Sequence, residues 1–179
     1  VRLIERHDFS RPLFLYVPFN APHGPYQAPR SQLDRFEDIE DPRKRAYAAM
    51  VTCMDEAIGR IVSAIDRRGV RRDTLIFFCS DNGGLDIVSS NGPFRGQKAF
   101  LYEGGIRVRA FAAWPGVLEP GAKVRGPLHM VDLFPTLLEL AGGRPGSGGA
   151  GPLDGKDAWA AIAEGRPSPR DEILLNVTP

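Results

Sequence analysis

Two oxygen-bearing side chains directly follow a short apolar segment in the middle of this sequence. Residues 75–79 (LIFFC) lead through Ser80 to Asp81 and Asn82, and two glycines come next. A carboxylate beside an amide oxygen suits a hard divalent cation such as Ca²⁺ or Mg²⁺. The same residue types are also common in an Asx turn, where the side chains only bond to nearby backbone groups. Taken alone, Asp81, Asn82 and the two glycines favour the Asx turn. A metal site therefore needs support from other parts of the sequence.

A histidine is the second candidate for chemistry. His23 follows the apolar run 13–17 (LFLYV), and Pro22 and Pro25 restrict the backbone on either side of it. This arrangement favours a fixed imidazole just beyond the end of a strand. A single histidine in a loop is, however, more often an ordinary surface residue.

Positively charged candidates lie in residues 85–105, a stretch that is rich in glycine and has little apolar periodicity. Loops of this length without regular structure are uncommon unless they form a site. Lys98 could bring a compact positive charge to an anion, and Arg95 or Arg107 could do so as a planar fork. Taken singly, each of these side chains is more often a solvated surface charge.

The elements expected to position these residues are a strand, a helix and a second strand. We predict strands over residues 13–17 and 75–79, because both runs are apolar and rich in β-branched or aromatic side chains. Between them, apolar residues recur at helical spacing from the capping residue Asp41 to the stop at Gly69. This succession predicts a βαβ unit with two parallel strands. Asp81 and His23 would then follow strand C-termini, where ligands bind in open α/β sheets.

The second part of the chain is predicted to hold shorter elements. Residues 109–114 read as a strand, and Asp132 is expected to cap a helix that Gly142 ends. His129 precedes that cap and more often serves the start of a helix than a function. A connector, a short helix and a final apolar run that could join the sheet are expected at residues 144–151, 158–163 and 173–175.

Composition excludes several classes of function. The chain has 179 residues, of which 42% are hydrophobic and 25% charged, with a net charge of +1. This length can bury one sizeable core, and the charge balance indicates neither nucleic acid nor a membrane surface as a partner. No apolar run is long enough to span a membrane. Cys53 and Cys79 are expected to be buried free thiols. The sequence does not begin with Met, and we expect it to be an excerpt of a longer protein.

Several stretches, taken in order, resemble the type I sulfatases, the arylsulfatase family of the alkaline phosphatase superfamily. The similarity covers most of the chain and is nearest in character to N-acetylgalactosamine-4-sulfatase-like enzymes. The stretches that carry it are FLYV with APH at 14–23, YAAM with Asp55 at 47–55, SDNGG at 80–84, RG with Lys98 at 95–98, EGGIRV at 103–108, WPG at 114–116 and DLFPTL at 132–137.

The resemblance implies an α/β fold: an alkaline-phosphatase-like sandwich with a largely parallel mixed central sheet flanked by helices, of which this chain would be a partial domain. Residues 1–143 would form the C-terminal portion of the sulfatase catalytic domain. Residues 144–179 would be a connector, a short helix and an apolar segment that lead toward the smaller C-terminal subdomain. Relatives often have His followed by Asn where this chain has Leu175 and Asn176.

The resemblance also implies roles for particular residues. Asp81 and Asn82 would be two ligands of an active-site Ca²⁺, with Mg²⁺ as an alternative. Lys98 would contact the sulfate ester, and His23 would contact sulfate or assist the leaving oxygen. Residues 103–107 would brace the site.

The nucleophile of the family is a formylglycine made from Cys or Ser in a Cys/Ser-X-Pro-X-Arg motif, and this sequence contains no such motif. The formylglycine is therefore expected upstream, and the chain by itself is expected to be inactive. The upstream half of the same catalytic domain would then be its partner.

The function expected from the resemblance is hydrolysis of a sulfate monoester in a sulfated small molecule or glycan. Two alternatives stay open at this point. One is a phosphodiesterase or phosphonate hydrolase of the same superfamily, since both chemistries hold a tetrahedral anion beside a metal ion. The other is a truncated, non-catalytic domain that binds sulfated glycans. The resemblance suggests a periplasmic or secreted protein.

Overall fold

The computed structural model describes residues 1–144 and 151–175. The chain divides into two compact units, Val1–Ala112 and Ala113–Pro179. The first unit contains the predicted site residues, and the second contains Asp132 and the helices that follow it.

The first unit is built on one long helix, α3 (Pro42–Arg67). The carboxylate of Asp41 accepts a hydrogen bond from the backbone N–H of Arg43 at 2.8 Å and caps the helix, as the sequence predicts. Gly69 follows the helix with φ of +70°, a conformation that glycine adopts without steric cost. The predicted helix over 41–69 is therefore confirmed at both ends.

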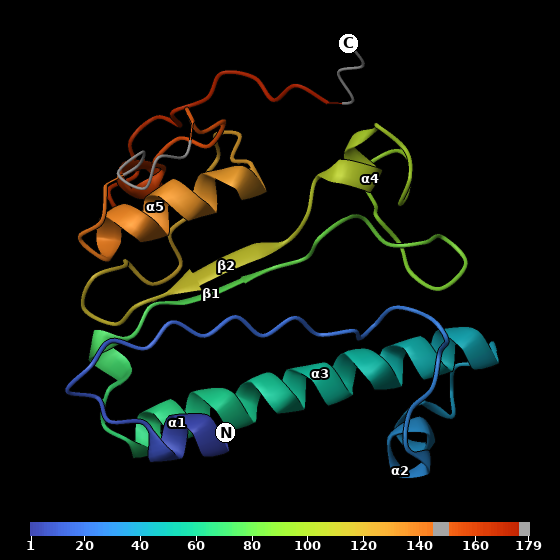
Figure 1. The fold of residues 1–179 in the computed structure, drawn as a ribbon. Helices are drawn as coiled ribbons and strands as arrows, with labels where there is room; N and C mark the ends of the chain where they lie inside the picture. The colour runs from blue at the N-terminus through green and yellow to red at the C-terminus, as the bar shows by residue number, and fades with distance from the viewer. Residues whose placement is uncertain (145–150, 176–179) are drawn as a thin grey trace. The chain divides into compact units, whose positions relative to one another are not determined.

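A small apolar core lies between α3 and the N-terminal helix α1 (Arg2–Arg6). Ile4 packs with Ala64 and Ile65, and side chains that include Phe9, Leu13, Ile61, Val70 and Ile76 cover this cluster. Figure 1 shows α1 beside the C-terminal half of α3. The remaining short elements are α2 (Arg30–Leu33), η1 (Asp34–Phe36), η2 (Arg71–Asp73) and α4 (Glu103–Ile106).

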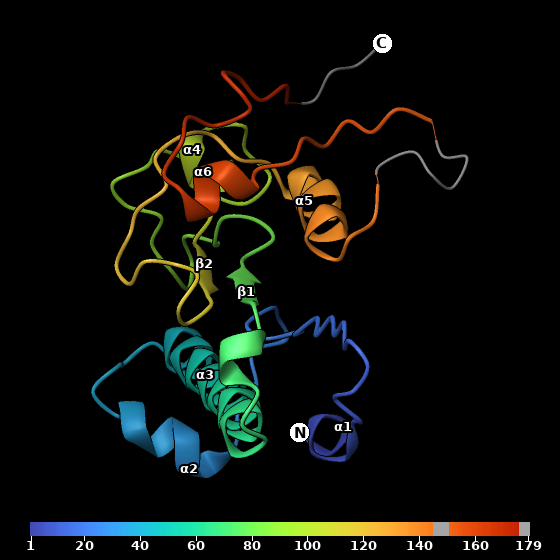
Figure 2. The same ribbon diagram turned by 90° about the vertical axis from the view of Figure 1, so that its left-hand side faces the viewer.

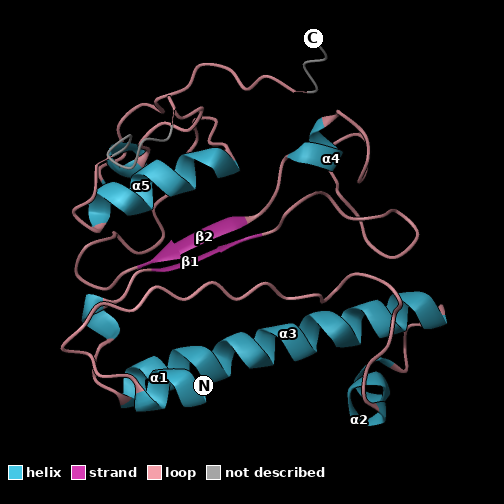
Figure 3. Ribbon diagram, in the orientation of Figure 1, coloured by secondary structure: helices cyan, strands magenta, loops and turns pink. Residues whose placement is uncertain are grey.

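Two predicted strands form a pair. β1 (Ile76–Cys79) is hydrogen-bonded to β2 (Ala110–Ala113). Their arrows point in opposite directions in Figure 3, so this two-stranded sheet is antiparallel. The rings of Phe78 and Phe111 stack across the pair with centroids 6.2 Å apart. Ser80 N–H donates to the carbonyl of Arg109 at 3.0 Å, which fixes the backbone just before Asp81.

The predicted buried strand over residues 13–17 is wrong for the described structure. The segment has no strand assignment, and Phe14 and Tyr16 are 80% and 77% exposed. A strand requires a neighbour to satisfy its backbone groups, and β1 and β2 pair with each other rather than with this segment. Consequently the predicted βαβ unit does not form within the described residues.

The second unit contains α5 (Leu133–Leu140) and α6 (Trp159–Ala163), both labelled in Figure 2. Both were predicted, and Gly142 with φ of +79° follows α5 as expected. Trp114 and Trp159 pack together with ring centroids 5.9 Å apart. Residues 173–175 form no strand. Most of the predicted connector, residues 145–150, and Asn176 lie outside the described residues.

Candidate functional site

The turn after β1 presents two oxygen-bearing side chains, those of Asp81 and Asn82. Asp81 is exposed and Asn82 is half-buried. The backbone is fixed locally, since Ser80 Oγ donates to the carbonyl of Asn82 at 3.1 Å. Within residues 1–144 and 151–175, no hydrogen bond reaches the carboxylate of Asp81 or the side-chain amide of Asn82. An Asx turn would require such a bond to the backbone, so the side chains of Asp81 and Asn82 do not form one within the described residues.

Lys98 is tied to the same turn through its backbone. Its N–H donates to the carbonyl of Gly84 at 3.2 Å, and the residue is half-buried. The next residue, Ala99, has φ of +73°, where a Cβ atom costs roughly 1–2 kcal/mol. Such strained backbone persists only where surrounding contacts hold it. The structure therefore brings Lys98 beside the residues that follow Asp81 and Asn82.

Close contacts between glycine backbones hold this loop together. Gly83 N–H donates to the carbonyl of Gly105 at 2.9 Å. A Cβ atom added to Gly83 would lie 1.8 Å from the carbonyl oxygen of Gly104, and one added to Gly104 would lie 2.1 Å from that of Gly96. No other residue type fits at these two positions without displacing backbone. The segment 103–107 thus supports the turn, in agreement with the bracing role expected from the sequence.

Sequence reasoning missed Asn91, whose side chain connects the parts of this loop. Asn91 Oδ1 accepts a hydrogen bond from Gly84 N–H at 2.8 Å, and Nδ2 donates to the carbonyl of Gly84 at 2.9 Å. Its position among Ser and Gly residues is typical of an ordinary turn, and no spacing in the sequence singles it out. Only the three-dimensional contacts indicate its importance.

His23 lies in an exposed loop of its own. Its backbone N–H donates to the carbonyl of Asn20 at 2.9 Å, and its Nδ1 lies 2.8 Å from the carbonyl oxygen of Gly24. Because a carbonyl oxygen can only accept, Nδ1 carries a proton and Nε2 is the ring atom able to exchange one. These contacts stay within residues 20–24. They fix the imidazole, but they do not join it to Asp81, Asn82 or Lys98.

The two arginines near Lys98 are engaged with aromatic rings. The guanidinium of Arg95 lies 4.0 Å from the ring centroid of Tyr102, and that of Arg107 lies 4.6 Å from that of Phe94. Arg107 also pairs with Glu103 at 3.2 Å. These contacts explain both arginines as supports of the loop.

Cys79 does not have the character of a nucleophile. Cys53 and Cys79 are free thiols, each half-buried rather than fully buried as predicted. Burial, and to a lesser extent the negative charge of Asp81, raises the pKa of the Cys79 thiol above its ordinary value of 9.0. The thiol therefore stays protonated at neutral pH, and its reactive form is scarce.

Asp132, in the second unit, is the centre of a buried polar cluster. It is 2% exposed, and its carboxylate accepts hydrogen bonds from the guanidinium of Arg170 and from the backbone N–H groups of His129 and Lys156. Burial acts to raise the pKa of the Asp132 carboxyl, but these hydrogen bonds, with that from Arg170 the strongest, hold it below the ordinary value of 3.8. The cluster connects residues 129–132, 156 and 170.

The predicted capping role of Asp132 is wrong in detail. Its side chain makes no capping bond to α5, although the helix begins where expected. His129 instead accepts a hydrogen bond from Val131 N–H at its Nδ1, and with Asp132 forms the cap of the short helix η3 (Met130–Asp132). Thus His129 serves a helix N-terminus, the commoner of the two roles considered for it.

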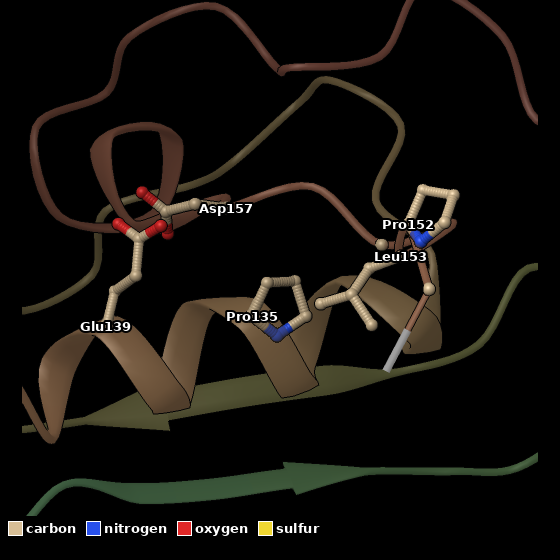
Figure 4. A pocket seen from close by; sticks show the side chains of 7 residues that line it. Pro135, Glu139, Pro152, Leu153 and Asp157 are labelled. Atoms are coloured by element: carbon tan, nitrogen blue, oxygen red, sulfur yellow. The ribbon is translucent and has the colours of Figure 1, made fainter. Parts of the chain in front are cut away.

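A cavity of about 270 Å³ lies in the second unit and contains none of the predicted site residues. Figure 4 shows Glu139 and Asp157 on the same side of it, with Pro135, Pro152 and Leu153 as apolar lining. Asp157 Oδ1 already accepts a hydrogen bond from Trp159 N–H at 2.9 Å. Nothing in its lining pairs a nucleophile with a base.

Comparison with known proteins decides the family. The family model described as Sulfatase matches residues 1–143. The chain belongs to the sulfatase family. The predicted resemblance to type I sulfatases and the predicted fold class are thereby confirmed.

Individual sulfatases are similar over nearly the whole chain. Arylsulfatase J of Mus musculus is 40% identical over 179 residues, which cover 99% of this chain and 30% of the relative. Steryl-sulfatase of Mus musculus is 35% identical over 184 residues, 97% of this chain and 28% of the relative. The crystal structure of Ps i-CgsB superposes with a TM-score of 0.79 at 34% identity, covering 86% of this chain and 34% of that one. The chain thus spans about 30% of the length of these curated sulfatases.

The side-chain oxygens of Asp81 and Asn82 could form part of a metal site. The described residues contain no group of three or more His, Cys, Asp or Glu side chains that could hold a metal ion. Ca²⁺ takes roughly 6–8 oxygen ligands, so Asp81 and Asn82 can supply only part of its shell. Both side chains offer hard oxygen donors on one turn, and this chemistry suits the part of the Ca²⁺ ligand shell that they can supply. Separately, no described helix combines the length and apolar character needed to cross a membrane.

Proposed function

We propose that this chain is part of a sulfuric ester hydrolase and supplies one side of its active site. The observation that supports this most strongly is the hydrogen bond between Lys98 N–H and the carbonyl of Gly84, at 3.2 Å. It joins a basic residue to the turn that carries two oxygen donors, in a chain of the sulfatase family. Hydrolysis of a sulfate ester needs fixed positive charge at the sulfuryl oxygens, and this loop provides residues for it.

Asp81 and Asn82 are the proposed metal ligands, for Ca²⁺ or, with the same donors, Mg²⁺. When bound, such an ion withdraws charge from the oxygens of the sulfate group and so makes the sulfur more susceptible to attack. The carboxylate of Asp81 contributes the negative charge that holds the ion. The amide oxygen of Asn82 contributes a neutral donor, so the charge of the ion is not fully cancelled.

Lys98 and His23 are the proposed contacts to substrate. The ammonium group of Lys98 binds the sulfate group as a compact charge, and the backbone bond to Gly84 limits where it can reach. His23 carries its fixed proton on Nδ1, as the bond to Gly24 requires. Its Nε2 is therefore the atom that would contact sulfate or, when it also carries a proton so that the ring is an imidazolium, pass that proton to the leaving oxygen.

Other parts of the active site are proposed to lie outside this sequence. In sulfatases the attacking group is a formylglycine, and no motif for it occurs in these residues. We therefore propose that residues 1–143 form the C-terminal portion of a catalytic domain, followed by a segment leading to a smaller subdomain. The upstream half of the domain is the proposed partner. The exposure of Phe14 and Tyr16, at 80% and 77%, supports a covering partner for the segment 13–17.

The proposed substrate is a sulfated small molecule or glycan. Support comes from a related structure, Ps i-CgsB in complex with k-i-k-neocarrahexaose, which is 33% identical and superposes with a TM-score of 0.78. Hydrolysis assays on a set of sulfate esters would identify the particular ester, beginning with the 4-sulfate of N-acetylgalactosamine that the sequence resemblance suggests.

The test compares hydrolysis of p-nitrophenyl sulfate and p-nitrophenyl phosphate by a protein that contains this chain and the rest of the sulfatase domain. We expect the sulfate ester to be the better substrate, and we expect the isolated chain to hydrolyse neither. Faster hydrolysis of the phosphate ester would instead support a phosphatase-type enzyme. Loss of hydrolysis together with retained binding of a sulfated glycan would support a non-catalytic domain.

A further inference from the structure

We propose that Asn91 is a positioning residue that sets the distance between the metal-binding turn at 81–82 and the substrate-binding Lys98. This inference rests on the proposed function of those residues. Asn91 itself is not expected to contact metal or substrate. Its role follows from the hydrogen bonds of one side chain to both segments.

The first pair of bonds holds the turn. The amide of Asn91 bonds to both backbone groups of Gly84: Oδ1 accepts from the N–H at 2.8 Å, and Nδ2 donates to the carbonyl at 2.9 Å. Two bonds to one residue fix position and orientation together. Gly84 lies two residues after Asn82, so this contact limits the movement of the oxygen donors.

A further bond reaches the segment that carries Lys98. Nδ2 of Asn91 also lies 3.3 Å from the carbonyl oxygen of Gly96, two residues before Lys98. The carbonyl of Gly84 in turn accepts from Lys98 N–H at 3.2 Å. Nδ2 additionally lies 3.3 Å from Asp86 Oδ1, so its two hydrogens are shared among three acceptors. The two segments are therefore connected both directly and through Asn91.

Asparagine is the residue type that this position requires. Its amide donates and accepts on one short side chain, whereas aspartate cannot donate when ionised and alanine can do neither. A carboxylate at this position would also face Asp86.

Catalysis is sensitive to this connection. A displacement of about 1 Å in the placement of a reacting group can reduce the rate about 100-fold. Loss of Asn91 frees the turn and the Lys98 segment to move relative to each other. The ligands themselves stay intact, so the damage falls on alignment in the transition state rather than on substrate binding.

The experiment uses the protein that contains the whole sulfatase domain, with variants N91A and N91D. The matched control is S89A, which removes a hydrogen bond from Ser89 Oγ to the carbonyl of Leu85 at 3.0 Å within the same loop. For each protein, kcat and KM on p-nitrophenyl sulfate, the hydrogen exchange rate of the Lys98 amide and the thermal unfolding midpoint are measured.

We expect N91A and N91D to lower kcat about 10- to 100-fold with KM changed less than about threefold, and to speed exchange of the Lys98 amide. S89A is expected to stay within about twofold of wild type. Two results would overturn the inference: N91A with unchanged kcat, or N91A with a lower kcat accompanied by an equally large change in KM and a lowered unfolding midpoint, which would indicate general loss of loop structure. A wild-type protein that hydrolyses no sulfate ester would contradict the proposed function. Lys98 amide exchange would still decide whether Asn91 connects the two segments.

Discussion

Asp81 and Asp132 are two aspartates that occupy opposite kinds of environment in this chain. Asp132 is 2% exposed, and its carboxylate is bonded to Arg170 and to two backbone N–H groups. Asp81 is exposed, and no hydrogen bond reaches its carboxylate within the described residues. Its position is instead fixed through neighbouring backbone, at Ser80 and at Gly83.

The difference separates a structural carboxylate from one available to a ligand. A buried charge is tolerated only when its bonding capacity is used within the protein. A metal ligand has the opposite requirement: its backbone must be held while its oxygens stay unused. The glycine contacts of the 83–105 loop meet that requirement without placing a donor on Asp81.

The largest expected effect on stability is at Asp132. Replacing Asp132 by Ala leaves the guanidinium of Arg170, whose side chain is 14% exposed, without its carboxylate partner, although its bond to the carbonyl of Asp154 remains. We expect a loss of about 3–5 kcal/mol in the free energy of unfolding. The matched variant D81A should change it by less than about 0.5 kcal/mol. Denaturant unfolding of both proteins measures this, and equal losses would remove the distinction between the two aspartates.

For activity we expect the opposite pattern, in which the loop that contains Asp81 matters most. Lys98, which is bonded to this loop, tests the expectation. Replacing Lys98 by Ala removes the proposed charge at the sulfate group, and kcat/KM should fall about 100- to 1000-fold. K98R should recover little, because a planar guanidinium does not reproduce a compact ammonium. Unfolding free energies should match wild type. Steady-state hydrolysis of p-nitrophenyl sulfate is the measurement, and full activity in K98A would remove Lys98 from the site.

The pH dependence of stability should depend on Asp132. The pKa of its carboxyl in the native protein lies below the value of 3.8 expected after unfolding, so the unfolded state binds the proton more readily. The contribution of Asp132 is therefore fully present above the ordinary value and is lost as pH falls through the lower native pKa. Denaturant midpoints of wild type and D132N, measured from neutral to strongly acidic pH, should converge at the acidic end. If the two midpoints instead differ by the same amount at every pH, the result would argue against a stabilising ion pair between Asp132 and Arg170.

A small effect is expected at Cys79. The charge of Asp81 helps to raise the pKa of this thiol, although burial is the larger cause. D81N should therefore speed alkylation of Cys79 at mildly alkaline pH, by no more than about fivefold. Cys53 is the internal control, and mass spectrometry distinguishes the two sites. Faster alkylation in wild type than in D81N would contradict the claim that the charge of Asp81 raises the pKa of Cys79.

Local signals in the sequence were sufficient for much of the fold. The helix over 41–69 was predictable because its periodicity and both of its ends lie in one stretch of sequence. The strand at 13–17 was not, since a strand depends on a neighbour that an apolar pattern does not reveal. Asp132 was assigned to a helix cap because nothing local indicates Arg170, 38 residues further along the chain.

The candidate site was predictable only in part. Asp81 and Asn82 stand out because they directly follow an apolar strand. Lys98 became prominent only through family resemblance, and the backbone bond that ties it to Gly84 emerged from the structure. Asn91 was not predicted, because an asparagine in a loop of Ser and Gly is typical of any turn. His23 remains a prediction, since its recorded contacts lie within its own loop.

The most direct test of the account is a calcium titration. Calorimetry would compare this chain alone, the chain joined to the rest of the sulfatase domain, and the joined protein carrying D81A. The account predicts tight binding only in the joined protein and a strong loss in D81A, because Asp81 and Asn82 supply only part of the ligand shell. Calcium binding by the joined protein that is unaffected by D81A would contradict it.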